Sequence, residues 1–81
     1  MQLEIITPDK SVYKGEVSSA TFPGTKGSFQ VLNNHAPLVS TLGKGKLTYK
    51  GGGQQTTLMV EGGVVEVKNN HIVVLAEKIL D

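Results

Sequence analysis

Apolar and polar residues alternate along many short stretches of this chain, and glycine, proline or asparagine bounds most of them. Leu47 and Tyr49, for example, share one side of a stretch whose other side carries Thr48 and lysines. A period of two residues is typical of a β-strand, because successive side chains point to opposite faces of a sheet. The pattern predicts strands over residues 2–7, 11–16, 17–22, 29–32, 46–50, 54–60, 64–68 and 71–76, with a further strand after Pro37.

The most irregular segment runs from Pro23 to Leu42. Proline fixes φ and lacks an amide donor, and glycine reaches positive φ without steric cost, so Pro23-Gly24 and Gly27 predict a turn. Ala36 precedes a proline and is therefore restricted to extended conformations. We expect a turn, a strand, a second turn and a second strand here.

Glycine and asparagine also punctuate the second half of the chain. Asn69-Asn70 fits the two central positions of a type I′ turn, where both residues need positive φ. The glycines at 51–53 predict a hairpin, whereas residues 43–45 and 61–63 are expected to interrupt strands. The apolar run at 71–76 is expected to be a strand buried on both faces.

These short strands predict an all-β fold, either a β-sandwich or a flattened barrel. Only residues 77–81 have the pattern to start a helix, and five residues do not hold a helix alone. The sequence shows no internal repeat, linker or low-complexity segment. We therefore expect residues 1–81 to form one domain.

Composition removes several classes of function. The chain has no cysteine, which excludes disulfides, thiol nucleophiles and zinc sites built on cysteine. All eight basic residues are lysines and only four residues are aromatic, which argues against nucleic-acid binding. No apolar run is long enough to span a bilayer, and the first residues do not have the order of a signal peptide.

Candidate catalytic and metal-binding groups are sparse. His35 and His71 are the only imidazoles, and neither has the nucleophile and carboxylate of a triad beside it in the sequence. The acidic residues do not cluster at metal-ligand spacing. The glycine-containing runs at 24–28 and 43–46 lack the phosphate-loop spacing and a following helix. We expect no catalytic residue, metal or cofactor site.

Several motifs, taken together, resemble a known family. The chain opens with Leu3-Glu4-Ile5-Ile6-Thr7-Pro8, and its most distinctive part runs from Pro23-Gly24 to His35-Ala36-Pro37-Leu38. A second group is Gly62-Gly63-Val64-Val65-Glu66-Val67, followed by Val73-Val74-Leu75-Ala76. This pattern is similar to the N-terminal β-domain of the ε subunit of rotary F-type ATP synthases. Gln30, Asn33-Asn34 and Val64 depart from residues common in that family.

The resemblance implies a flattened sandwich of two roughly five-stranded sheets. Many members continue into a C-terminal helical hairpin, and we expect residues 1–81 to depart from the family in lacking it. It implies a non-catalytic rotor subunit of the central stalk that links the γ subunit to the ring of c subunits. Such a subunit couples proton or sodium flow to ATP synthesis. It would be peripheral to the cytoplasmic face of a bacterial inner membrane, with no cofactor, no nucleic acid and no small-molecule substrate.

The resemblance also implies two sets of contact residues. The set expected to face the c ring consists of Thr25, Lys26, Gly27, Ser28, Phe29 and Gln30. The set expected to face γ consists of Thr7, His35, Ala36, Pro37, Leu38 and Ser40.

Three other functions remain as alternatives at this point. A biotinyl or lipoyl carrier domain is also a small β-sandwich, but it needs a modifiable lysine at an exposed hairpin tip. Lys26 lies between Thr25 and Gly27 rather than in the Met-Lys-Met or Asp-Lys-Ala setting of such carriers. A nucleic-acid-binding barrel would need surface aromatics and a basic stripe. A small hydrolase would need a catalytic constellation.

Overall fold

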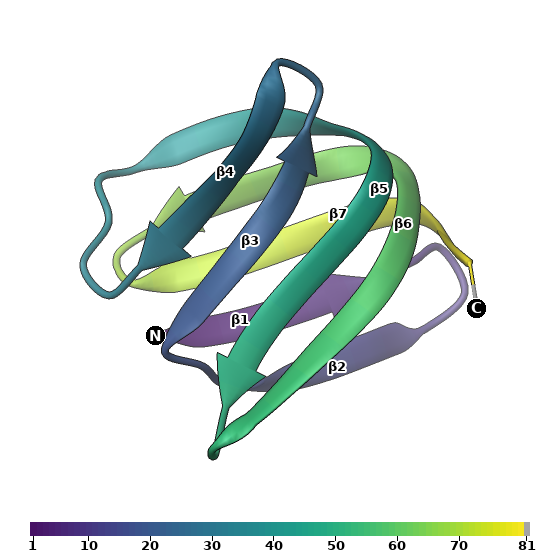
Figure 1. Cartoon of the computed structure of the whole chain (residues 1–81). Helices are drawn as coiled ribbons and strands as arrows, with labels where there is room; N and C mark the ends of the chain where they lie inside the picture. Colours follow the sequence, from purple (N-terminus) through teal and green to yellow (C-terminus); the bar gives the residue numbers. More distant parts are fainter. Residues whose placement is uncertain (81) are drawn as a thin grey trace.

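The computed structural model describes residues 1–80 and contains seven strands, with no helix over those residues (Figure 1). The prediction of an all-β fold is confirmed. Among the described residues no helix is long and apolar enough to cross a membrane. The strands are β1 (Gln2–Ile6), β2 (Ser11–Glu16), β3 (Ser19–Gly24), β4 (Gly27–Leu32), β5 (Leu38–Gly51), β6 (Gln54–Lys68) and β7 (His71–Leu80).

All seven strands belong to one sheet in the order β2-β1-β7-β6-β5-β3-β4. Neighbouring strands are antiparallel except β1 and β7, which are parallel. The sheet folds over on itself, so that β3 crosses in front of β7 and β4 crosses in front of the end of β6 in Figure 1. The result is a flattened sandwich, as the sequence predicts.

Three strands belong to both layers of the sandwich. The first layer contains β2 and β1 with the beginning of β7, the end of β6 and the beginning of β5. The second contains β4 and β3 with the rest of β5, β6 and β7. Each layer thus has five strands when the shared strands are counted in both. This explains why nine or so short strands are predicted where seven are observed.

The shared strands bend at residues that the sequence marks as interruptions. The regular pairs of β5, β6 and β7 continue in the same register on both sides of Gly43, Gly62 and Glu77. Gly63 has φ 137°, and a Cβ built there would lie 2.3 Å from the carbonyl oxygen of Leu75. Only glycine allows so close an approach between two backbones. The expected interruptions are therefore bends within continuous strands.

The bend also changes which side of each strand faces inward. In β5 the buried residue before the bend is Leu42, at an even-numbered position, whereas the buried residues after it are Leu47 and Tyr49, at odd-numbered positions. The buried positions of β6 change likewise, from the even-numbered Val60 before the bend to the odd-numbered Val65 after it. The inward side chains of both layers form one core around the fully buried Phe22, and none of its buried residues is polar or charged over residues 1–80.

The structure corrects three details of the prediction. The strand expected at 17–22 is β3 (Ser19–Gly24), because Val17 lies in the connection before it. Residues 77–80 continue β7 instead of starting a helix, while residue 81 lies outside the described part. The run at 71–76 is not buried on both faces, since Leu75 is 53% exposed. By contrast, the predicted turn at Asn69 and Asn70 is confirmed by φ values of 52° and 60°.

Candidate interaction surfaces

The outer side of the first layer exposes aliphatic side chains. We call it the apolar face and define it by Ile6, Val39, Val64, Val73 and Leu75. Val39 is 70% exposed, Leu75 53% and Val64 38%, whereas Ile6 and Val73 are half-buried. Val64, Leu75 and Ile6 are successive cross-strand neighbours on β6, β7 and β1. Exposed aliphatic side chains aligned in one row across a sheet are typical of a surface that contacts another protein.

The outer side of the second layer is polar. We call it the lysine face and define it by Lys44, Lys46, Thr48, Lys50 and Thr57. Thr48 and Thr57 are cross-strand neighbours whose hydroxyl oxygens lie 3.2 Å apart. Lys44 Nζ lies 3.9 Å from Glu61 Oε2, and both side chains are exposed, so this ion pair adds little stability. This face has the composition of an ordinary solvated surface.

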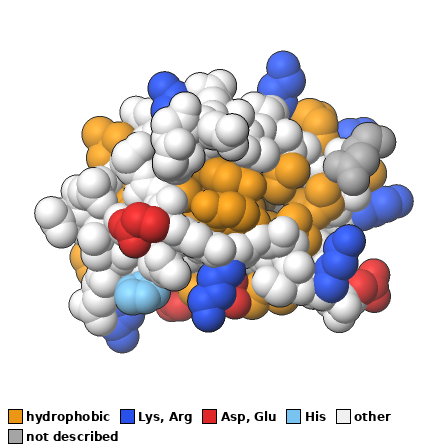
Figure 2. Space-filling view, turned by 90° about the horizontal axis from the view of Figure 1, so that it is seen from below, with side chains coloured by type: hydrophobic (Ala, Val, Ile, Leu, Met, Phe, Trp, Pro, Cys, Tyr) orange, Lys and Arg blue, Asp and Glu red, His pale blue; other side chains and the backbone are white. Residues whose placement is uncertain are grey.

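An open side separates the rims of the two layers. Figure 2 shows hydrophobic side chains in the hollow between polar side chains and backbone. A shallow pocket of about 380 Å³ lies between β2 and the end of β7, with Val12, Leu58 and Ile79 in its lining. These three side chains are only partly buried and pack against the core. Partly buried side chains therefore cover the core along this side.

The residues expected to face the c ring come together on the β3–β4 hairpin. The turn packs against β5, because Thr25 donates its amide to the Thr41 carbonyl at 3.1 Å and their hydroxyl oxygens lie 2.7 Å apart. Phe29 stacks on Phe22 with 5.5 Å between ring centroids. Lys26 is exposed in the turn itself. The hairpin is thus an anchored projection with polar residues at its tip.

Five of the six residues expected to face γ lie together in the β4–β5 connection and the start of β5. Thr7 does not join them. It follows β1 and lines a second hollow together with Pro8 and Leu75. The cross-strand row from Thr41 through Val64 and Leu75 to Ile6 lies between these two places. The apolar face therefore connects the two parts of the predicted γ-facing set.

The histidines take part in local hydrogen bonds. His35 Nδ1 lies 2.7 Å from the carbonyl oxygen of Ala36, and the His35 amide donates to the Leu32 carbonyl at 3.2 Å. His71 Nδ1 lies 3.2 Å from the carbonyl oxygen of Asn69. Within residues 1–80, no three His, Asp or Glu side chains are grouped as they would be to bind a metal ion. His35 organises its own loop in this structure.

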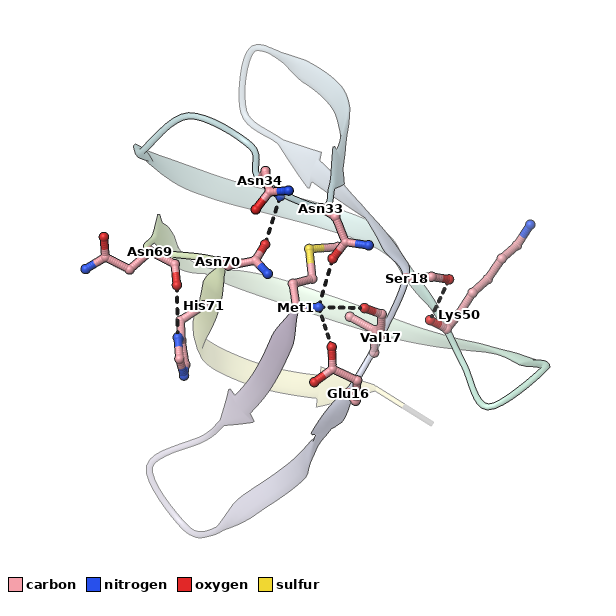
Figure 3. A network of polar contacts seen from close by, with 10 residues as sticks. All are labelled: Met1, Glu16, Val17, Ser18, Asn33, Asn34, Lys50, Asn69, Asn70 and His71. Carbon is pink, nitrogen blue, oxygen red and sulfur yellow. Dashed lines mark hydrogen bonds and ion pairs between the residues drawn. The ribbon is translucent and has the colours of Figure 1, made fainter.

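Polar contacts at the same end of the sandwich join segments that are distant in sequence (Figure 3). The α-amino group of Met1 forms an ion pair with Glu16. It also donates to the Val17 carbonyl at 3.2 Å and to Asn33 Oδ1 at 2.9 Å. The backbone amide of Asn34 donates to Asn70 Oδ1 at 2.8 Å. The start of β1, the β4–β5 loop and the β6–β7 turn are thereby tied together.

The sequence reasoning missed the apolar face. Its residues belong to runs such as 71–76 that are apolar at every position, so their pattern does not reveal which side faces water. A usable signal was available in the neighbouring strands, where Glu4 and Glu66 mark the outward side. Glu4 and Glu66 are the cross-strand neighbours of Val73 on its two sides.

A comparison with protein families decides the relationship. The family described as "ATP synthase, Delta/Epsilon chain, beta-sandwich domain" matches residues 1–81. The chain belongs to this family. The resemblance inferred from the sequence motifs is thus confirmed.

Curated relatives agree with this assignment. The chain is 48% identical over 77 residues to the ATP synthase epsilon chain of Leptospira interrogans, covering 95% of this chain and 61% of the relative. It is 44% identical over 77 residues to the ATP synthase epsilon chain of Nitratidesulfovibrio vulgaris, covering 95% of this chain and 58% of the relative. The chain therefore spans about three fifths of the length of these relatives.

Two solved structures share the fold. A chain in the central stalk and c-ring structure of the Tetrahymena thermophila mitochondrial ATP synthase superposes with a TM-score of 0.85 at 18% identity. That match covers 99% of this chain and 65% of the other. A chain in the Euglena gracilis mitochondrial ATP synthase gives a TM-score of 0.89 at 23% identity, with 96% and 51% covered. At these identities the likeness shows the fold.

Lys26 is the residue on which the carrier-domain alternative depends. Lys26 does lie at an exposed hairpin turn, which is the place where a carrier would be modified. Its neighbours Thr25 and Gly27 are not those of a carrier, however, and the family match covers the whole chain. The sequence around Lys26 and the family match therefore argue against a carrier domain.

Proposed function

We propose that this chain is a non-catalytic rotor subunit of an F-type ATP synthase, seated between the γ subunit and the c ring. In this role it would transmit rotation and couple ion flow to ATP synthesis. It would belong to a complex at the cytoplasmic face of a bacterial inner membrane without entering the bilayer itself. Membership of the family supports this proposal.

The observation that carries the proposal is the apolar face. A domain of this size buries only about 60–65% of the surface of its unfolded chain, so its core is thin. When a partner covers aliphatic side chains that such a domain exposes to water, the free energy falls and binding is favoured. The face lies between the two groups of residues expected to contact γ, and we propose that γ covers it.

The β3–β4 hairpin is the proposed contact with the c ring. Its tip is polar, with Thr25, Lys26 and Ser28 exposed, and it is anchored through Thr41 on β5. Because the hairpin is anchored to β5, its polar tip should keep its position under torque and maintain contact with the exposed loops of the ring. Lys26 and Ser28 are the residues proposed to make polar contacts there.

Calorimetric titration of this chain into purified γ subunit tests the proposal. We expect saturable one-to-one binding by the native chain and a loss of at least about tenfold in affinity for Leu75→Lys. The reason is that burying an unpaired ammonium opposes docking by several kcal/mol. The exposed site of this substitution should keep the free energy of unfolding within about 0.5 kcal/mol.

Thr57→Lys is the matched control, because it adds the same charge to an exposed strand position on the lysine face. It should bind γ like the native chain. Native affinity in Leu75→Lys, or an equal loss in both variants, would remove γ from the apolar face. No binding by the native chain would overturn the rotor proposal in this form.

A further inference from the structure

One hydrogen bond ties the loop that carries His35 to the β6–β7 turn. The backbone amide of Asn34 donates to Asn70 Oδ1 at 2.8 Å, between residues 36 positions apart in the chain (Figure 3). We infer that Asn70 is a positioning residue, which sets the direction in which residues 34–37 leave the sandwich. The inference rests on the proposed function, since these residues are part of the proposed γ contact.

The turn itself offers no acceptor for the amide of Asn34. The His35 amide donates to the Leu32 carbonyl at 3.2 Å, which closes a four-residue turn. Asn34 has φ 63° at the third position of that turn, as a type II turn requires. The closing hydrogen bond of such a turn satisfies the fourth residue and leaves the amide of the third without an internal acceptor. Asn70 supplies the acceptor from another part of the sheet.

The residue type at position 70 fits this role. Asn70 has φ 60°, in the left-handed region where glycine is the least strained residue. Glycine would suit the backbone of the turn but has no side-chain oxygen. Asparagine and aspartate tolerate this conformation and also carry a short acceptor. Asn70 therefore meets two requirements, whereas Asn69, at φ 52° in the same turn, shows no side-chain bond to the loop among the described contacts.

The loop has a second attachment that does not depend on Asn70. Asn33 Oδ1 accepts a hydrogen bond from the α-amino group of Met1 at 2.9 Å. Removing the Asn70 acceptor leaves this attachment and the turn in place, so the loop should stay folded but change its direction. The Asn34–Asn70 bond is exposed, and water can solvate the freed amide. Substitution at Asn70 should therefore cost little stability and act mainly on the orientation of the loop.

His35 transmits that orientation to the proposed contact. Its ring is bonded to the next residue, through the 2.7 Å contact between Nδ1 and the Ala36 carbonyl oxygen. Pro37 then restricts Ala36 to an extended conformation. His35, Ala36 and Pro37 should consequently move together when the amide of Asn34 is released. A shift of the loop would misplace all three against a rigid partner.

Three variants test the inference. Asn70→Gly keeps the backbone conformation and removes the acceptor, whereas Asn70→Asp keeps both. Asn69→Gly makes the same change at the neighbouring turn position and serves as the control. Amide hydrogen exchange followed by NMR reads the Asn34 amide directly. We expect exchange to be roughly two- to tenfold faster in Asn70→Gly, as for the loss of one exposed hydrogen bond, and native in the other two variants.

Titration into γ then separates positioning from simple loss of stability. We expect γ affinity to fall by a similar factor, roughly two- to tenfold, in Asn70→Gly and to be native in Asn70→Asp and Asn69→Gly. Unchanged exchange at Asn34 in Asn70→Gly would overturn the inference. Faster exchange with native γ affinity would overturn the positioning role alone and leave the rotor proposal standing. Failure of the native chain to bind γ would overturn both.

Discussion

The two outer faces of the sandwich share strands β5 and β6 and differ in almost every side chain. β5 places Val39 on the apolar face and Lys46 and Lys50 on the lysine face. β6 likewise contributes Val64 to the first and Thr57 to the second. The apolar face has aliphatic residues with Glu4 and Glu66 between them, while the lysine face has threonines and ammonium groups. Only the first has a composition that a partner would stabilise by covering it.

The difference teaches that each half of a bent strand has its own environment. A strand without such a bend would keep the same side chains facing outward in one alternating pattern along its whole length. At Gly43 in β5 and Gly62 in β6, each strand passes from one layer to the other. The inward side chains change there between even-numbered and odd-numbered positions. The outer side is therefore defined separately before and after the bend. The fold can thus keep one solvated face and one contact face on strands with a single register.

The largest expected effect comes from removing the bend that separates the faces. Gly63→Ala should lower the free energy of unfolding by about 2–5 kcal/mol, because its Cβ would overlap the Leu75 carbonyl and its φ of 137° is strained for alanine. Denaturant unfolding followed by circular dichroism measures this.

Gly43→Ala is the control for that substitution. It lies at the same bend in β5, where a Cβ would meet only the Pro23 carbonyl oxygen at 3.9 Å. Its free energy of unfolding should stay within about 1 kcal/mol of the native value. Equal stability of the two variants would mean that the bend does not depend on the close approach at Gly63.

The same bends show which parts of the fold could be predicted from the sequence. Alternation and turn residues were enough for the all-β class and the Asn69-Asn70 turn, because both depend on local backbone preferences. The sequence could not show that separately predicted strands join into β5 and β6, since glycine is typical both of a bend within a strand and of a loop between strands. The apolar face was missed because β7 is apolar on both sides around Val73. Burial there depends on which layer lies behind the strand, and that is a property of the tertiary fold.

A second prediction contrasts the two faces as binding surfaces. If γ covers the apolar face, calorimetry at several temperatures should give a negative heat-capacity change, the signature of apolar burial. Affinity should change less than about threefold between low and physiological salt, because few charges are involved. The double variant Lys46→Gln with Lys50→Gln should bind like the native chain. A steep loss of affinity with salt, abolished in the double variant, would instead assign γ to the lysine face.

A third prediction separates the β3–β4 hairpin from the lysine face. Lys26→Glu with Ser28→Asp should reduce ion-coupled ATP synthesis by the assembled complex severalfold, because charge reversal at the tip opposes polar contact with the ring. The free energy of unfolding should change by less than about 0.5 kcal/mol, since both positions are exposed. Lys46→Glu with Thr48→Asp applies the same charge change to the lysine face and should leave synthesis intact. Native coupling in the hairpin variant would exclude Lys26 and Ser28 from the ring contact.

The smallest expected effect concerns the core beneath the lysine face. Burial raises the pKa of Tyr49 above its usual value near 10; a hydrogen bond to Thr56 opposes the shift and the neighbouring Tyr13 adds to it. Because the folded state holds this proton more tightly than the unfolded state, stability is full below pH 10 and falls as pH rises through the raised pKa. Tyr49→Phe, which keeps the ring packed 4.4 Å from that of Tyr13, should lose this part of the alkaline decline. Unfolding of both proteins from neutral to alkaline pH, with tyrosinate absorbance as a second readout, measures the difference. Identical pH dependence would mean that Tyr49 reaches water more freely than its place under the lysine face implies.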